Sequence, residues 1–558
     1  MTVPADRTSS TSTPGSTSSD DTAADDDDTA ATGSADTAAP ADPVAGSTGG
    51  QSPRASTDRV VFGVAAALVV GVVVWGLAAP DNLNTVTGGV LDWIVEDLGW
   101  LFVLTASGFV IFALWLAVSK FGTIPLGKDG EKPEFRTVSW IAMMFSAGMG
   151  IGLMFYGVAE PLTHYVSPPP RSAGGAGPAM ATTMFHWSLH PWSIYAVVGL
   201  SIAYGTYRKG RKQLISAAFI PLLGRRAEGP IGKVIDILAL YATLFGTAAS
   251  LGLGALQIGS GFEVTGWLEQ AGVLLLVAIV AVLTLAFIAS AVSGVSKGIQ
   301  WLSNINMVLA LGLALFVFVL GPTVLILNLI PTTLGAYVAD LARMSARTAA
   351  SSPEAGEWLS SWTIFYWAWW ISWTPFVGMF LARISRGRTI RQFVIGVIIV
   401  PSIVSLLWFA VFGGAAIGQQ QDGHDVAGAD SLEAQLFGML GNLPLVGIST
   451  VIVMLLVAIF FVSGADAASM VMGTLTQHGT LSPSRWVVVF WGALTGGVAA
   501  LLLWTGGSEA LGALQTMTII AAAPFVVVMV GLCVSLYRDL SRDPLVRRPR
   551  HPTLRRTG

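Results

Sequence analysis

Residues 60–79 read VVFGVAAALVVGVVVWGLAA, an apolar stretch without a charged residue. A bilayer core roughly 30 Å thick is crossed by a helix of about 20 such residues. The stretch follows the polar residues 1–57 and lacks the small-residue cleavage site of a signal peptide. We therefore expect it to stay in the protein as a membrane span.

The composition of the 558-residue chain agrees with a membrane protein. Hydrophobic residues make up 53% of it and charged residues only 11%, against about 25% charged residues in soluble proteins. This deficit excludes an ordinary soluble enzyme, a disordered regulator and a nucleic-acid-binding protein. The net charge of −3 provides no basic field for a polyanion. The single cysteine, Cys533, excludes a disulfide framework and a multi-cysteine metal cluster.

Apolar stretches recur along the chain and predict twelve spans, near residues 60–79, 97–118, 138–158, 182–206, 234–262, 272–295, 300–330, 361–382, 392–417, 447–472, 486–505 and 512–536. Lys and Arg gather in alternate loops, which the positive-inside rule assigns to the cytoplasm. The loops on the other side hold only three of the 30 basic residues, Arg171, Arg343 and Arg347. We predict an all-α integral membrane protein with both termini cytoplasmic.

The two tails differ in composition. Residues 1–57 are rich in Ser, Thr, Ala, Gly and Pro and carry four consecutive aspartates at 25–28. This segment cannot bury a core, so we expect it to be disordered. Residues 538–558 are rich in arginine. They fit either a topological anchor or a switch that senses anionic lipid or the acidic N-terminal tail.

Glycine weakens the third span. Residues 146–153 read SAGMGIGL, with Gly148, Gly150 and Gly152 at alternate positions. Each glycine costs a helix about 1 kcal/mol relative to alanine. Unwound backbone at membrane depth is tolerated where it lines a cavity, and its carbonyls can coordinate a cation. Close packing of helices through small residues is the alternative interpretation.

Aromatic residues mark the eighth and fourth spans. Residues 362–376 read WTIFYWAWWISWTPF, and membrane tryptophans normally gather at the two interfaces. Three of these lie near mid-bilayer instead: Trp369, Trp370 and Trp373. The fourth span adds three aromatic residues within one arc of its helix, around Pro191: Trp187, Trp192 and Tyr195. We expect both clusters to face one cavity, although packing against lipid is the alternative for any single residue.

Such a cavity suits a quaternary ammonium group. This group cannot donate a conventional hydrogen bond, so a carboxylate binds it only at a large desolvation cost. An aromatic face attracts it through the ring quadrupole, by about 2 kcal/mol or more per ring when water is excluded. Three or four rings could therefore replace its hydration without a fixed counter-charge in the membrane.

Three stretches resemble the betaine/carnitine/choline transporter family: GMGIGLMFYGVAEPLTHY at 148–165, FHWSLHPWSIY at 185–195 and WAWWISWTPFVGMFLARISRGR at 367–388. The sequence is most similar to the sodium-coupled glycine-betaine symporters. The resemblance implies a LeuT-like core of two inverted five-helix repeats, in a homotrimer in the inner (plasma) membrane. The expected division is an N-terminal tail (1–57), two peripheral helices (58–137), repeat one (138–330), an extracytoplasmic amphipathic helix and loop (331–360), repeat two (361–537) and a C-terminal tail (538–558).

The resemblance also implies site residues. The family's aromatic box corresponds to Trp187, Trp192, Tyr195 and Trp370, with Trp369 and Trp373 beside it. Backbone of the broken third span would complete the substrate site at Gly148, Met149, Gly150 and Gly152. Two sodium sites would use Ala147, Met149, Thr243, Thr247, Phe376, Phe460 and Ser463. Hard cations prefer such oxygen ligands. No cofactor other than sodium as coupling ion is expected.

Two positions bear on the cargo and its coupling. The sodium symporters carry two adjacent hydroxyl residues in the tenth span, whereas this chain has Ser463 followed by Gly464. Sodium remains favoured because Thr243 and Thr247 are both present. Relatives that carry choline typically have an acid where this chain has Gly152. The glycine favours a zwitterion such as glycine betaine, ectoine, proline or carnitine.

Other functions compete with sodium-betaine symport. The chain could transport choline or carnitine by proton coupling or exchange, or could be a membrane-embedded osmolyte sensor or channel. An enzyme is not expected, because the six histidines form no HExxH spacing and no GxSxG motif is present. His186 and His190 lie four residues apart, and we expect a structural hydrogen-bonding role because no neighbouring acid completes a site. Glu160, before Pro161, is expected to mark the outer end of the third span.

Overall fold

The computed structural model describes residues 56–148, 150–293 and 296–547, and these residues are helical throughout their regular structure. The single extended pairing among them is an isolated bridge between Pro125 and Thr389. The all-α prediction is therefore confirmed. The predicted tails, 1–57 and the part of 538–558 after residue 547, lie almost wholly outside the described residues.

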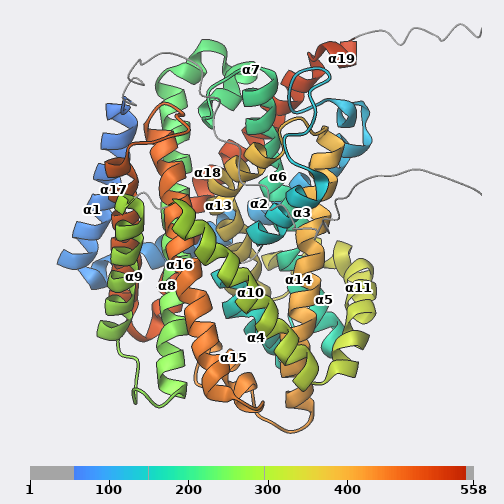
Figure 1. The fold of residues 1–558 in the computed structure, drawn as a ribbon, viewed down its shortest axis with the longest axis vertical. Helices are drawn as coiled ribbons and strands as arrows, with labels where there is room; N and C mark the ends of the chain where they lie inside the picture. Colours follow the sequence, from blue (N-terminus) through green and yellow to red (C-terminus); the bar gives the residue numbers. More distant parts are fainter. Residues whose placement is uncertain (1–55, 149, 294–295, 548–558) are drawn as a thin grey trace, which may run out of the picture. The chain divides into compact units, whose positions relative to one another are not determined.

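Fifteen long helices form the body of the molecule (Figure 1): α1 (Arg59–Ala78), α2 (Pro80–Val118), α3 (Thr137–Gly148), α4 (Ile151–Val166), α5 (Ala176–Trp187), α6 (Leu189–Ala203), α8 (Pro230–Val264), α9 (Val273–Ser293), α10 (Ser296–Leu320), α11 (Thr323–Ser345), α13 (Phe365–Ile384), α14 (Ile390–Gln421), α16 (Val446–Thr476), α17 (Arg485–Gly506) and α18 (Ala510–Ser541). Short helices connect or follow them: α7 (Ile220–Leu223), α12 (Ala355–Leu359), α15 (Leu432–Gly441) and α19 (Pro544–Arg547).

Eight helical segments of the described chain are long and apolar enough to cross a membrane, against twelve predicted spans. The eight include α11 and count the predicted eleventh and twelfth spans as one stretch, Arg485–Ser541. The predicted third and fourth spans are not among the eight, because each is broken into two short helices. The seventh is represented by the shorter apolar helix Asn304–Leu320. The eighth, α13, is helical but rich in tryptophan, which hydropathy scales do not rank with the aliphatic residues.

Capping residues explain where several helices begin. Asp58 precedes α1, and its Oδ1 accepts hydrogen bonds from the backbone N–H groups of Val60 and Val61 (3.0 and 3.2 Å). Thr389 precedes α14 and forms a reciprocal capping box with Gln392. Each cap satisfies backbone donors that a helix start leaves without partners.

The helix contacts are those expected of two equivalent repeats. Helix α6 packs along α13, and the α3–α4 pair packs along α14 in the corresponding place. Helices α8 and α16 pair with each other, as do α9 and α17. Helix α8 also contacts α18, as α16 contacts α10. When predicted spans 3–7 are exchanged with predicted spans 8–12, each of these helix contacts becomes another contact of the same set. Because five is an odd number of membrane crossings, the second predicted repeat is inverted relative to the first.

The weak point predicted in the third span is a break in the structure, and the fourth span is broken as well. Helix α3 ends at Gly148 and α4 begins at Ile151, with Gly150 in extended backbone (φ −173°, ψ −177°). The fourth span breaks at Ser188, between α5 and α6. Pro191 explains this position, because its ring clashes with the carbonyl of the residue four earlier, Trp187, and it has no N–H to donate.

The predicted boundary near residue 330 is wrong. The seventh span ends at Leu320, and α11 runs from Thr323 to Ser345. Gly321 and Pro322 separate the two helices, because a residue before proline is driven out of helical conformation. The prediction ran past this break because the apolar pattern continues at residues 323–330.

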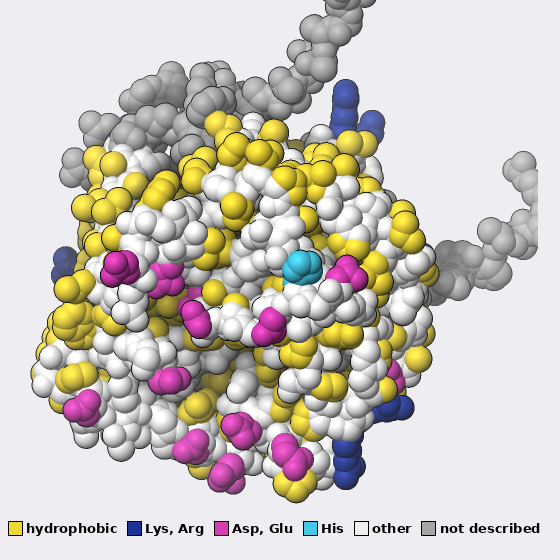
Figure 2. Space-filling view, turned by 90° about the horizontal axis from the view of Figure 1, so that it is seen from below, with side chains coloured by type: hydrophobic (Ala, Val, Ile, Leu, Met, Phe, Trp, Pro, Cys, Tyr) yellow, Lys and Arg dark blue, Asp and Glu magenta, His cyan; other side chains and the backbone are white. Residues whose placement is uncertain are grey.

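The charged loops lie at opposite ends of the helices. The basic loop 208–233 surrounds α7, at the end where α19 also lies, whereas α15 lies at the other end (Figure 1). Figure 2 views the molecule from the α15 end and shows acidic side chains across this face with few basic ones. Exposed acids there include Glu263 in the last turn of α8, Glu269 in the loop after it, and Asp422, Asp425 and Asp430 in the loop before α15. We call the two ends the basic end and the acidic end.

Candidate functional site

A cavity lies where the two broken spans meet α13. It has a volume of about 50 Å³. Its lining includes all four residues predicted as the aromatic box, together with Trp369, Trp373, Gly150, Gly152, Leu153, Pro191, Val377 and Ser405. The box side chains face this cavity and not the surrounding lipid. We call them the cage: Trp187, Trp192, Tyr195 and Trp370.

The cage rings meet edge to face. Trp187 and Trp370 have ring centroids 4.9 Å apart at an interplanar angle of 73°. Trp192 and Tyr195 are 5.3 Å apart at 74°, and Tyr195 lies 6.3 Å from Trp370 at 78°. Trp369 stacks behind Trp370 at 4.8 Å and 12°. No two of the cage rings stack face on face, and all four line the same cavity.

Hydrogen bonds fix the indole groups from behind. Trp370 Nε1 donates to the backbone carbonyl of His186 (3.0 Å), and Trp369 Nε1 donates to Ser250 Oγ (3.0 Å). Trp187 Nε1 donates to the carboxylate of Glu160 (2.7 Å). The N–H groups of these three indoles are thus hydrogen-bonded within the protein, and the rings line the cavity.

Residue 152 lies so close to the rings around the cavity that a residue with a side chain does not fit there. A Cβ atom at this position would come within 2.6 Å of Trp369 Cη2 and 2.9 Å of Trp187 Cη2. An acidic side chain at residue 152 would have to displace these rings. The structure thus gives a packing reason for the glycine in addition to the charge argument from the sequence.

A second, larger cavity adjoins the cage on the side of the basic end. Its volume is about 230 Å³, and its lining follows α13 and α16 toward their basic-end termini through Trp373, Phe376, Phe380, Phe460, Ser463 and Ala467. Thr247, Gly464 and Asn306 also line it. Asn306 is buried, and its Oδ1 has no hydrogen-bond partner in the described part of the chain.

The residues predicted to hold sodium are partly brought together. Thr247, Phe376, Phe460 and Ser463 share the larger cavity, and Gly150 lies between it and the cage. Thr243 lies one turn from Thr247 on α8, but it is fully buried outside the lining and donates to the carbonyl of Ala239 (2.8 Å). Met149 lies outside the described residues. Ala147 and Gly148 belong to the last turn of α3, and only their backbone is described.

The cage is sealed on the side of the acidic end. Tyr156, Tyr366 and Trp369 form a packed aromatic layer there, with centroids 5.3 to 6.2 Å apart, and each side chain is almost fully buried. The conformation is therefore closed toward the acidic end, while its larger cavity extends toward the basic end.

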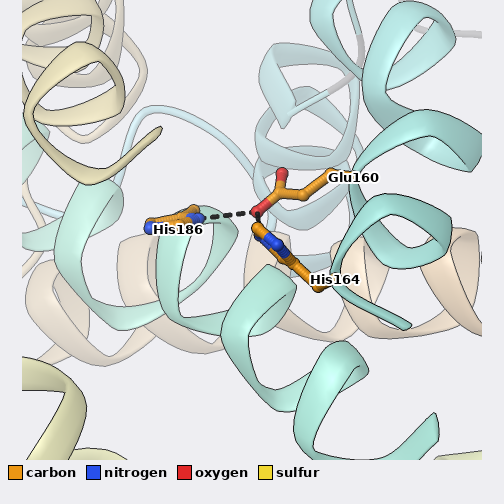
Figure 3. A group of neighbouring side chains, drawn as sticks. All are labelled: Glu160, His164 and His186. Carbon is orange, nitrogen blue, oxygen red and sulfur yellow. Dashed lines mark hydrogen bonds and ion pairs between the residues drawn. The ribbon is translucent and has the colours of Figure 1, made fainter. Parts of the chain in front are cut away.

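Glu160 does not mark the end of the third span, contrary to the prediction. Its side chain is fully buried, and its carboxylate accepts a hydrogen bond from His186 Nδ1 at 2.6 Å (Figure 3). It also accepts hydrogen bonds from Trp187 Nε1 (2.7 Å) and Tyr366 OH (2.5 Å). The expectation that no acid lies near His186 is also wrong. The two residues are 26 positions apart and meet only because α4 packs on α5.

Glu160, His164 and His186 each offer one ligand atom within 4.8 Å of the others. Two zinc ligands about 2.0 Å from a tetrahedral ion lie about 3.3 Å apart. The 2.6 Å between Glu160 Oε1 and His186 Nδ1 is instead a hydrogen-bond distance, whereas His164 Nε2 lies 3.5 Å from Oε1. The geometry favours a hydrogen-bonded cluster over a metal centre.

A helical membrane protein with broken helices around a buried aromatic site has the architecture of a transporter for a small solute. Comparison with known proteins agrees. The chain belongs to the betaine/carnitine/choline (BCCT) transporter family, whose model matches residues 60–545. It is thus a multi-pass membrane transporter.

Individual relatives are similar over most of their length. The betaine/ectoine transporter LcoP of Corynebacterium glutamicum is 45% identical over 509 residues, covering 90% of this chain and 80% of that protein. The glycine betaine transporter OpuD of Bacillus subtilis is 47% identical over 487 residues, covering 87% and 94%. A solved Na⁺-coupled sialic acid symporter is 14% identical, with a TM-score of 0.39, and covers 80% of this chain and 96% of that one.

Proposed function

We propose that the protein imports glycine betaine, or a related zwitterionic osmolyte such as ectoine, together with sodium. The observation that carries this proposal is the cage: four buried rings from α5, α6 and α13 line one cavity, and the indoles of Trp187 and Trp370 are held by hydrogen bonds. Desolvated aromatic faces are the chemistry that binds a methylated ammonium. Relatives named as betaine and betaine/ectoine transporters support the same substrate class.

The absence of room at Gly152 supports a zwitterion over choline. The carboxylate of a zwitterion balances its own ammonium charge, so the site needs no protein acid in contact with the ligand. The extended backbone at Gly150, between α3 and α4, provides polar groups beside the cage for that carboxylate.

Sodium coupling is supported by the oxygen atoms in the larger cavity. Thr247, Ser463 and Asn306 line it next to the broken third span, and hydroxyl and carbonyl oxygens are suitable ligands for a hard cation. Asn306 was not predicted from the sequence. Asn304, two residues earlier, is exposed, so only its burial in the fold distinguishes Asn306.

The mechanism follows from the asymmetry of the closed and open sides. We infer that solute and sodium enter from the acidic end, that the aromatic layer over the cage closes behind them, and that one repeat moves against the other. The ligands then leave through the larger cavity toward the basic end. By the distribution of Lys and Arg, the basic end is cytoplasmic, so both termini are cytoplasmic in a plasma-membrane protein. A homotrimer surrounded by lipid is the assembly that we propose.

Uptake into proteoliposomes tests the proposal. With an inward sodium gradient, purified protein should accumulate radiolabelled glycine betaine, and replacement of sodium by potassium should abolish accumulation. Choline and carnitine, with and without a proton gradient, test the alternative cargo and coupling. Accumulation of choline in preference to betaine would contradict the proposal, and so would betaine flux that ignores the sodium gradient.

A further inference from the structure

We propose that Glu160 is a positioning residue for the substrate cage, which acts by holding the indole of Trp187 in its binding orientation. This inference rests on the proposed function and deepens it. It assigns a role to a buried carboxylate that does not line either cavity.

The side chains around Glu160 are hydrogen-bond donors, and Glu160 is the acceptor that they share. An indole N–H can only donate, and Trp187 Nε1 donates to Glu160 Oε2 at 2.7 Å. The hydroxyl of Tyr366 donates to the same oxygen. His186 donates from Nδ1 to Oε1, and its Nε2 accepts from Thr363 Oγ1 at 2.9 Å. Every one of these side chains is buried, so water is not at hand to replace the carboxylate.

The cluster orients both walls of the cage. Glu160 holds Trp187 through its side chain, and the backbone carbonyl of His186 holds Trp370. The ring of His186 is itself bonded to Glu160. The carbonyl that holds Trp370 belongs to the backbone of α5, so within the edge-to-face pair at 73° it is Trp187 that depends on the Glu160 side chain.

The cluster also joins elements that are distant in the sequence. Glu160 lies on α4, Trp187 is the last residue of α5, and Tyr366 lies on α13, which belongs to the second repeat. All three contacts lie in the closed layer between the cage and the acidic end. The orientation of the cage thus depends on the closed packing of helices from both repeats.

Substitution Glu160→Gln preserves the size of the side chain but not its function. The amide has one oxygen for three donors, and its NH₂ group would face at least one of them. We expect the KM for glycine betaine to rise about tenfold, the effect of losing one charge-assisted hydrogen bond. Vmax should change less than the KM, because the reorientation weakens ligand binding first. Glu160→Asp keeps the charge but withdraws the carboxylate by one methylene, and we expect it to raise the KM as well.

A double-mutant cycle separates positioning from direct attraction of the ligand. Trp187→Phe removes the N–H that Glu160 holds, so Glu160→Gln should add less than about twofold to the KM in that background. A carboxylate that acted directly on the ammonium would instead multiply the two effects, and Glu160→Asp would then leave the KM nearly unchanged. Thr183→Val is the matched control, because Thr183 lies one turn before Trp187 on α5 and bonds only to the carbonyl of Ala179 in its own helix.

The measurement is the KM and Vmax of radiolabelled betaine uptake in proteoliposomes for these variants. A raised KM in Glu160→Gln or Glu160→Asp, with non-additivity in the Trp187→Phe background, supports the inference. An unchanged KM in both Glu160 variants, or multiplicative effects, overturns it while the proposed function stands. Failure of the unaltered protein to transport betaine overturns both.

Discussion

At the scale of single residues, the account depends on aromatic faces that replace the water around a methylated cation. The cage residues are 4 to 6% exposed, so a ligand among them is almost completely desolvated. In such surroundings each ring contributes about 2 kcal/mol or more. Loss of one ring should therefore be measurable without loss of the fold.

Trp370→Leu is the most direct substitution of this kind. Leucine keeps an apolar side chain but has no quadrupole, so we expect the KM for betaine to rise by about tenfold or more. Trp486→Leu is the control, because Trp486 lies on the lipid-exposed surface at 56% exposure. Equal KM values for the two variants in an uptake assay would argue against cation–π binding.

Gly152→Ala tests the close approach of the third span to the cage. The added methyl would overlap Trp369 and Trp187, and relief of such overpacking typically costs about 1–3 kcal/mol. We expect a KM for betaine raised about tenfold, measured in the same assay. Gly108→Ala on α2 should have no effect, since nothing lies within 4 Å of a Cβ there. A normal KM for Gly152→Ala would show that the rings move aside freely.

At the scale of helices, the sequence predicts elements well and long-range polar contacts poorly. Hydropathy locates the apolar helices, and three glycines locate the break between α3 and α4. Pro191 signals the break at Ser188, three residues before it. The partners of Glu160 are 26 to 206 positions away, so no local pattern reveals them. The end of α10 was missed because residues 323–330 continue the apolar pattern beyond Pro322.

The C-terminal end of α18 is held by ion pairs to the segment after α6. Arg208 donates from Nη2 to Asp543 (2.9 Å), and Tyr204 OH donates to the same carboxylate (2.7 Å). Burial raises the pKa of Asp543, but hydrogen bonds from Arg208, Tyr204 and the N–H of Leu545 outweigh it, and the pKa lies below its ordinary value of 3.8. Ionised Asp543 therefore stabilises the folded state above about pH 4, and this stabilisation is lost as the pH falls through the lowered pKa.

Asp543→Asn should reduce the free energy of unfolding by about 1–2 kcal/mol at neutral pH. The difference from the unaltered protein should shrink as the pH falls from 3.8 through the lowered pKa of folded Asp543, below which both side chains are neutral. Thermal unfolding in detergent at several pH values measures it. Asp430→Asn, an exposed acid of the opposite end, is the control. A pH-independent difference would mean that the carboxylate charge contributes nothing.

At the scale of the whole molecule, the cage is bounded differently on its two sides. The described conformation has a sealed aromatic layer toward the acidic end and a cavity of about 230 Å³ toward the basic end. This asymmetry predicts the side from which a reagent can reach the cavity.

A cysteine at Ala467, which lines the larger cavity, should react with a membrane-impermeant thiol reagent from the cytoplasmic side. The background is Cys533→Ala, and betaine with sodium should slow the reaction. A cysteine at the exposed acidic-end position Asp430 is the control and should react from outside. Labelling of residue 467 from outside alone would reverse the proposed orientation.

The central claim is tested most directly by a density map of the protein with bound glycine betaine. The account predicts the trimethylammonium group in van der Waals contact with the faces of Trp187, Trp192, Tyr195 and Trp370. A ligand bound elsewhere, or an ammonium group paired with a carboxylate in place of these rings, would contradict it.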